Sequence, residues 1–184
     1  QIIPSVKIKA ASSIGQYTYD NNPYLYLGAD SYTVAVGQSN LKNYKVAGGP
    51  QRAYSIGFEY RDPNYWFVGV TSNFFTNTYI DISPLTRTQN FYLAQDGLPF
   101  NDYNLNIAQD LLRQEKFDDY MVMNMIGGKS WRIDNYYVGF FASINNILNQ
   151  KYRTGGFEQG RNANYQELLQ LSLIHISEPT RPYL

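Results

Sequence analysis

Five polar and aromatic residues in the longest predicted loop have side chains suited to binding a solute. They follow a strand predicted at residues 65–78, and they are Tyr79, Asp81, Arg87, Asn90 and Tyr92. Tyrosine rings stack on sugars or on a siderophore, and a guanidinium pairs with an anionic group. The pattern therefore predicts that this loop contacts a ligand.

The sequence lacks the arrangements of residues that common catalytic mechanisms use. Nucleophilic catalysis on serine uses a histidine base, and residues 1–170 contain no histidine. Asp118 and Asp119 are adjacent, so on a strand their carboxylates would point to opposite faces. Their spacing from Asp81 matches no EF-hand loop, and the glycines at 155–160 lack the strand-to-helix setting of a phosphate loop. We therefore expect no enzyme activity, no cofactor and no metal site.

The segment at residues 171–184 differs from the rest of the chain. Its first eleven residues read LSLIHISEPTR, which resembles the translation of a transposon-based sequencing adapter. This resemblance implies that the segment, with the single histidine His175, is not native. We therefore exclude it when predicting fold and function.

The composition favours a neutral, aromatic surface. The chain has 18 Tyr, 10 Phe, 2 Trp and no Cys, its formal net charge is zero, and 16% of its residues are charged, against about 25% in soluble domains. A nucleic-acid partner is not expected, because it would require a basic stripe. The sequence also lacks the run of about 18 apolar residues that a transmembrane helix needs.

Alternation of side chains predicts five long strands. They are expected at residues 6–19, 44–60, 65–78, 120–132 and 136–145, with a short ribbon at 32–36 and one helix at 106–115. The turns at 61–64 and 133–135 are short, whereas the connections at 20–42 and 79–119 are long. Strands that cross a bilayer obliquely need roughly 9 to 11 residues, and soluble strands usually have about 5 to 6. We therefore predict an all-β fold in which residues 1–170 form part of an antiparallel transmembrane β-barrel.

The two faces of these strands have different side chains. One face is large and apolar, and we predict that it meets lipid through Tyr54, Ile56, Phe58, Val68, Val70, Met123, Val138 and Phe140. The other is small and polar, and we predict that it faces the barrel lumen through Ser55, Glu59, Thr71, Asn73, Asn124, Ser143 and Asn145. The aromatic residues near the turns, Tyr60, Tyr65, Trp66, Trp131 and Tyr136, are expected near the headgroups. A soluble sheet with one wet face has the same alternation, so a soluble, non-catalytic β-sheet domain of the carbohydrate-binding type remains the alternative.

Two stretches resemble a known family. Residues 48–66 read GGPQRAYSIGFEYRDPNYW, and residues 143–153 read SINNILNQKYR. The first resembles the C-terminal barrel of TonB-dependent receptors of the Bacteroidetes, in the group with a carboxypeptidase-regulatory-like domain. The second resembles their N-L-F-(D/N)-x-x-Y element, although Ile147 and Leu148 stand where the family often has Leu and Phe. Within residues 1–170 we recognise neither a plug domain nor a TonB box.

This resemblance implies a location and a set of partners. Such receptors lie in the cell outer membrane, bind a scarce solute in extracellular loops, and release it when the TonB energy-coupling complex pulls on a plug domain. The expected partners are therefore outer-membrane lipid, the plug, the TonB complex and a solute, which could be a siderophore, vitamin, oligosaccharide or peptide. On this expectation the chain is a fragment of the barrel wall with some of its binding loops.

Overall fold

The protein consists mainly of antiparallel β-structure, in two compact units whose segments alternate along the sequence. The computed structural model describes residues 5–94, 96–160 and 164–177. The sheet unit comprises residues 1–16, 48–79 and 116–155, and the loop unit comprises residues 17–47, 80–115 and 156–184.

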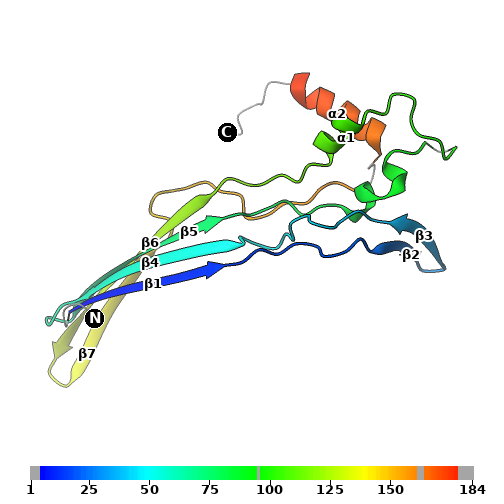
Figure 1. Ribbon diagram of the computed structural model, residues 1–184. Coiled ribbons are helices and arrows are strands. Elements are labelled where there is room, and N and C mark those ends of the chain that lie inside the picture. Colours follow the sequence, from blue (N-terminus) through cyan, green and yellow to red (C-terminus); the bar gives the residue numbers. More distant parts are fainter. Residues whose placement is uncertain (1–4, 95, 161–163, 178–184) are drawn as a thin grey trace. The chain divides into compact units, whose positions relative to one another are not determined.

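One five-stranded sheet forms the sheet unit (Figure 1). Its strands are β1 (Val6–Ile14), β4 (Arg52–Arg61), β5 (Trp66–Thr76), β6 (Tyr120–Ile133) and β7 (Tyr136–Ile144), paired antiparallel in that order. Among the described residues β1 and β7 each have one neighbouring strand, so the sheet is open. The prediction of five long strands in an all-β fold is confirmed.

Two predicted strand ends are wrong, and the backbone explains why. β1 ends at Ile14 rather than residue 19, and β4 begins at Arg52 rather than residue 44. Gly48 and Gly49 have φ angles of 126° and 147°, which a strand does not use. The strands themselves are 9, 10, 11, 14 and 9 residues long. All five therefore reach the length of about 9 to 11 residues that crosses a bilayer.

Short turns join β4 to β5 and β6 to β7. In the first, the amide of Tyr65 donates to the carbonyl of Asp62 (3.1 Å), and Tyr65 itself is left-handed with a φ of 62°. In the second, Asp134 has a φ of 53°. A two-residue hairpin such as the one at residues 134 and 135 uses positive φ at its first central residue, whereas Tyr65 is the left-handed last residue of a three-residue loop. Residues 130–133 of β6 pair with β7 alone, so this hairpin extends past the end of β5.

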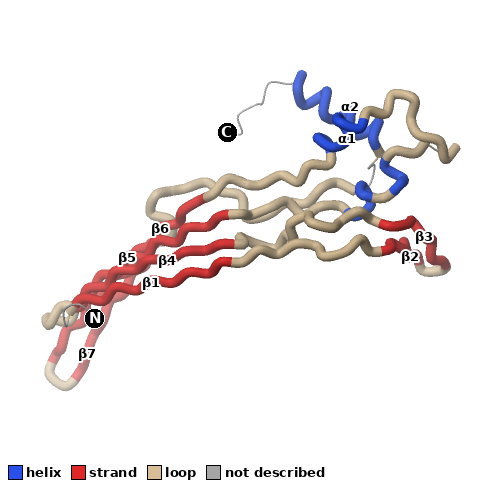
Figure 2. Tube along the Cα trace, viewed as in Figure 1, coloured by secondary structure: helices blue, strands red, loops and turns tan. Residues whose placement is uncertain are grey.

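The loop unit contains the helices and a second, smaller sheet (Figure 2). Its elements are β2 (Tyr24–Ala29), β3 (Tyr32–Gln38), the 3-10 helices η1 (Pro84–Arg87) and η2 (Gln89–Phe91), and the helices α1 (Leu105–Leu111) and α2 (Tyr165–Ser177). The predicted ribbon at residues 32–36 is β3, which pairs with β2. None of the helices in the described residues is both long and apolar enough to span a bilayer.

Helix α1 is shorter than the predicted helix at 106–115. It begins where the Asn104 side chain accepts hydrogen bonds from the amides of Asn106 and Ile107. It ends at Leu111, because Gln114 is engaged elsewhere: its side-chain amide donates to the carbonyls of Lys45 and Ile80 (both 2.8 Å). Tertiary hydrogen bonds therefore override the helical pattern.

An aromatic cluster forms the interior of the loop unit. Phe91, Ala108 and Tyr165 are buried, and Leu168 and Leu169 of α2 pack against them. Helix α2 thus contacts this cluster through Tyr165, Leu168 and Leu169, which precede the segment at residues 171–184 that is expected to be non-native. The helix continues to Ser177, and residues 178–184 of that segment lie outside the described residues.

Candidate functional site

The strand register places all eight residues predicted to face lipid on one face of the sheet. Paired residues in an antiparallel sheet share a face, and Phe58 pairs with Val70, which in turn pairs with Met125. The same parity holds for the others, Tyr54, Ile56, Val68, Met123, Val138 and Phe140. We call this face, with the β1 residues Val6, Ile8, Ala10, Ser12 and Ile14, the apolar face.

The opposite, polar face carries six of the seven residues predicted to face a lumen. Ser55, Glu59, Thr71, Asn73, Asn124 and Ser143 have this parity in the register. Asn145 lies one residue beyond the end of β7 and is therefore outside the sheet. The chain turns there: Asn146 has a φ of 51°, and its backbone amide donates a hydrogen bond to Asn124 Oδ1 (2.9 Å).

Large apolar side chains on the apolar face are open to the surroundings. Ile56 is 60% exposed and Phe140 is 65% exposed, and no described segment of the sheet unit covers them. Soluble monomers rarely expose contiguous apolar patches of more than a few hundred Å². This face is therefore suited to contact with an apolar environment.

Charged residues lie level with the two ends of β5 on this face, and the β6–β7 hairpin continues the face beyond Lys129. Of the described strand residues that share it, Arg52 and Lys129 are the charged ones, and they pair with Thr76 and Trp66 of β5. Trp66 and Thr76 are ten residues apart, which corresponds to about 33 Å along a strand. For a strand tilted by about 40° this gives a height of about 25 Å, which is the height of the apolar band of outer-membrane barrels.

The polar face satisfies its charges internally. Glu59 accepts from Lys9 Nζ at 2.9 Å and from Arg61 Nε at 2.5 Å. The guanidinium of Arg61 also lies 5.4 Å from the ring centre of Phe67. The ion pairs of Glu59 thus lie on the polar face, which also carries the exposed rings of Tyr137 and Phe141.

The five predicted ligand residues do not form one site. Tyr79 belongs to the sheet unit, where it bridges to Lys116, and the other four belong to the loop unit. Asp81 forms a backbone bridge to Phe157, Asn90 lies exposed in η2, and the ring of Tyr92 lies 5.7 Å from that of Tyr103. The structure thus distributes them around the loop unit and the sheet end.

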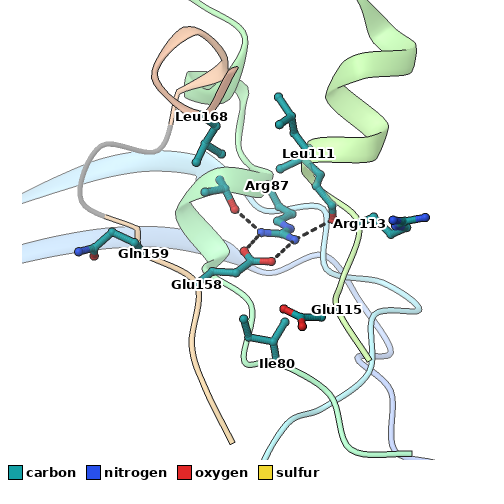
Figure 3. A pocket seen from close by; sticks show the side chains of 10 residues that line it. Ile80, Arg87, Leu111, Arg113, Glu115, Glu158, Gln159 and Leu168 are labelled. Atoms are coloured by element: carbon teal, nitrogen blue, oxygen red, sulfur yellow. Dashed lines mark hydrogen bonds and ion pairs between the residues drawn. The ribbon is translucent and has the colours of Figure 1, made fainter. Parts of the chain in front are cut away.

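Arg87 is buried and paired within the chain (Figure 3). Its guanidinium forms an ion pair with both carboxylate oxygens of Glu158, and Nη2 also donates to the carbonyl of Leu112 at 2.8 Å. The ring of Tyr44 lies 4.9 Å from its Cζ atom. The side chains of Arg87 and Glu158 are 2% and 20% exposed, so this cation is not presented to an anionic solute.

A small cavity lies beside this ion pair. Its volume is about 220 Å³, and its walls include Ile80, Leu111, Arg113, Glu115 and Leu168 (Figure 3). Ligand pockets usually measure about 300 to 1,000 Å³. This cavity therefore fits a few waters or a very small solute, and is too small for a chelate or an oligosaccharide.

The described residues contain no group of three or more His, Cys, Asp or Glu side chains placed to hold a metal ion.

The sequence did not predict the roles of two residues, Glu158 and Lys129. Glu158 lies 71 residues from Arg87, in a glycine-rich stretch with no pattern that indicates a buried partner. Lys129 could have been noticed, because its parity with Met125 and Trp131 places a charge on an otherwise apolar face. The alternation in β6 carried that signal.

Comparison with known proteins gave no match: no protein-family model, no curated protein and no solved structure is similar to this chain.

Proposed function

We propose that this chain forms part of the wall of an outer-membrane β-barrel receptor that imports a scarce solute with energy from the TonB complex. The observation that carries the proposal is the apolar face, which is exposed and, between the levels of Arg52 and Lys129 on β5, is about 25 Å high for a tilted strand. An open edge at β1 and at β7 is consistent with further strands on both sides, since about eight strands are the minimum for closure.

The arrangement of the connections supports the same proposal. Turns of a few residues join β4 to β5 and β6 to β7, whereas the connections from β1 to β4 and from β5 to β6 are long. Outer-membrane barrels have short periplasmic turns and longer extracellular loops. The loop unit would then be extracellular, and the resemblance of residues 48–66 and 143–153 to TonB-dependent receptors supports the TonB complex as the energy source.

Thiol labelling tests the membrane part of this proposal. The chain has no cysteine, so Ile56→Cys and Ser55→Cys, neighbours on opposite faces of β4, form a matched pair for the expressed protein that contains this chain. In isolated outer membranes we expect a small water-soluble maleimide to modify Ser55→Cys and to spare Ile56→Cys. If the protein is recovered in the aqueous fraction and both thiols react equally, the soluble β-domain is the better account.

Transport needs a separate measurement. Deleting the gene should reduce uptake of one solute among iron chelates, vitamins, oligosaccharides and peptides, and deleting the gene for TonB should give the same defect. If deleting the gene lowers uptake by the same amount in cells with and without TonB, the barrel admits the solute but does not use TonB energy.

A further inference from the structure

Lys129 has an unusual position for a charged residue. It lies on the apolar face of β6, between Trp66 of β5 and Phe140 of β7. Its Nζ atom donates to the carbonyl of Asn64 in the β4–β5 turn at 3.3 Å. A lysine at the margin of an apolar band lays its stem along that band and holds its ammonium at the headgroup level. Lys129 therefore lies level with the β4–β5 turn, and the β6–β7 hairpin continues the face beyond it.

Asp62 provides a negative charge next to this lysine. Its carboxylate accepts from the Asn64 amide at 2.8 Å and from the Tyr60 hydroxyl at 2.9 Å. The Asn64 amide is the main cause of a lowered pKa for Asp62, the Tyr60 hydroxyl adds to it, and the charge of Lys129 contributes further. Asp62 is thus ionised near neutral pH, and both charged groups contact Asn64.

An aromatic pair lies beside the two charges. The rings of Tyr60 and Trp66 are 5.1 Å apart, and both residues belong to the apolar face. Aromatic faces attract ammonium groups, and tyrosine and tryptophan are enriched at membrane interfaces. The turn end of the apolar face therefore combines a cation, an anion and an aromatic wall.

The ammonium of Lys129 retains hydrogen-bonding capacity. It has three N–H donors, and one of them has an acceptor, the Asn64 carbonyl, among the residues that the structure describes. Glu59 and Glu158, by contrast, lie in ion pairs with other cations. At the depth of Lys129 the abundant anion of a bilayer is the phosphate of a phospholipid.

We propose that Lys129, Asp62, Tyr60 and Trp66 form a binding site for the headgroup of phosphatidylethanolamine. The lipid phosphate accepts from Lys129 Nζ, and the ethanolamine ammonium lies against Asp62 and the aromatic pair. A zwitterionic headgroup matches the two opposite charges, whereas an anionic headgroup leaves Asp62 without a partner and choline has no N–H to donate. This inference rests on the proposed function, because it requires the apolar face to lie in a bilayer.

Lipid retention measures this site. The expressed protein that contains this chain is reconstituted in nanodiscs of phosphatidylcholine with a minor fraction of phosphatidylethanolamine or phosphatidylglycerol, and retained lipids are counted by native mass spectrometry. We expect the wild type to retain phosphatidylethanolamine preferentially, and Lys129→Gln to weaken that retention about tenfold, as expected for one charge-assisted hydrogen bond. Asp62→Asn should abolish the preference over phosphatidylglycerol, and Lys129→Arg should keep phosphate binding.

A lysine on the other face provides the control. Lys7→Gln removes the same charge from the polar face of β1 and should leave lipid retention unchanged. Equal losses in Lys7→Gln and Lys129→Gln, or none in Lys129→Gln, overturn the site. Displacement of the lipid by inorganic phosphate would assign the cluster to free phosphate instead. If the protein does not enter the bilayer at all, the proposed function fails, and that result is visible before any lipid is counted.

Discussion

The loop unit and the sheet unit differ in the exposure of their large apolar side chains. In the loop unit Phe91 and Tyr165 are 2% and 0% exposed, and leucines of α1 and α2 pack around them. In the sheet unit Ile56 and Phe140 extend from the middle of long strands and are more than half exposed. The same chain therefore contains one part organised around an interior and one part whose apolar surface points outward.

Charges follow the same division. The loop unit buries Arg87 and neutralises it with Glu158, as a water-soluble fold must. The sheet unit instead places the ion pairs of Glu59 on the polar face. The loop unit excludes water from its own interior, and the proposed function would give the sheet unit a bilayer as its apolar phase.

Removing the carboxylate of Glu158 should have the largest effect, and it should be confined to the loop unit. In Glu158→Ala the guanidinium of Arg87 stays buried without its counter-ion, and breaking a buried pair in this way costs about 3 to 5 kcal/mol. We expect hydrogen exchange in α1 and η1 to accelerate accordingly, while β4 to β6 remain protected. Native-state hydrogen exchange on the membrane-embedded protein measures both.

An exposed ion pair offers the matched control. The side chains of Lys116 and Asp119 are 44% and 39% exposed, and their atoms lie 3.2 Å apart. Lys116→Ala should cost less than about 1 kcal/mol, because water replaces the lost partner. Similar costs for Glu158→Ala and Lys116→Ala would show that burial of Arg87 does not matter to the loop unit.

A charge on the apolar face should have the next largest effect. Ile56 lies between the levels of Arg52 and Lys129, so Ile56→Arg puts a cation close to the middle of the bilayer. This should destabilise the barrel by about 2 to 4 kcal/mol, and Ser55→Arg on the polar face should cost much less. The measurement is a denaturant titration of the protein folded in phosphatidylcholine vesicles.

Water and a bilayer make opposite predictions for Ile56. In water an exposed isoleucine on a sheet surface can become arginine at little cost, since surface substitutions usually change stability by less than about 0.5 kcal/mol. Equal and small losses for Ile56→Arg and Ser55→Arg would therefore favour the soluble β-sheet domain and remove the contrast between the two units.

The sheet was predictable from the sequence because its rule is local. Side chains alternate with a period of two, so the parity of Tyr54 or Val68 identifies its face without knowledge of the pairing. The register then adds the partner on each neighbouring strand. Strand ends were less predictable: β4 begins at Arg52, where the positive φ angles of Gly48 and Gly49 delay the start.

The loop unit was less predictable because its contacts are long-range. The pairing of Arg87 with Glu158 joins two segments 71 residues apart, and no periodicity relates them. The predicted ligand role of Arg87 rested on residue type alone. In the structure its guanidinium is instead paired with the carboxylate of Glu158. The predicted end of α1 was wrong for a similar reason, since the side chain of Gln114 donates hydrogen bonds to the distant carbonyls of Lys45 and Ile80.

The smallest effect should come from a pair of adjacent glycines in β6 that lie on opposite faces. A Cβ on Gly128 would lie 2.7 Å from Cε1 of Phe67 and 2.8 Å from the carbonyl of Phe140, whereas a Cβ on Gly127 would meet only the Phe67 carbonyl, at 3.3 Å. The ring of Phe67 therefore crosses Gly128 on the polar face, where its centroid also lies 6.3 Å from that of Phe141.

Substituting these two glycines separates packing from exposure. Gly128→Ala should cost about 1 to 3 kcal/mol, because the added methyl overpacks against a ring and a backbone atom. Gly127→Ala adds its methyl to the apolar face, which would meet lipid in the proposed barrel, and should cost less than about 1 kcal/mol. The same vesicle titration compares them, and adding Phe67→Ala should recover part of the loss in Gly128→Ala but change nothing for Gly127→Ala. If Gly127→Ala is the more harmful of the two, the apolar face packs against protein rather than lipid, and the sheet unit has an interior after all.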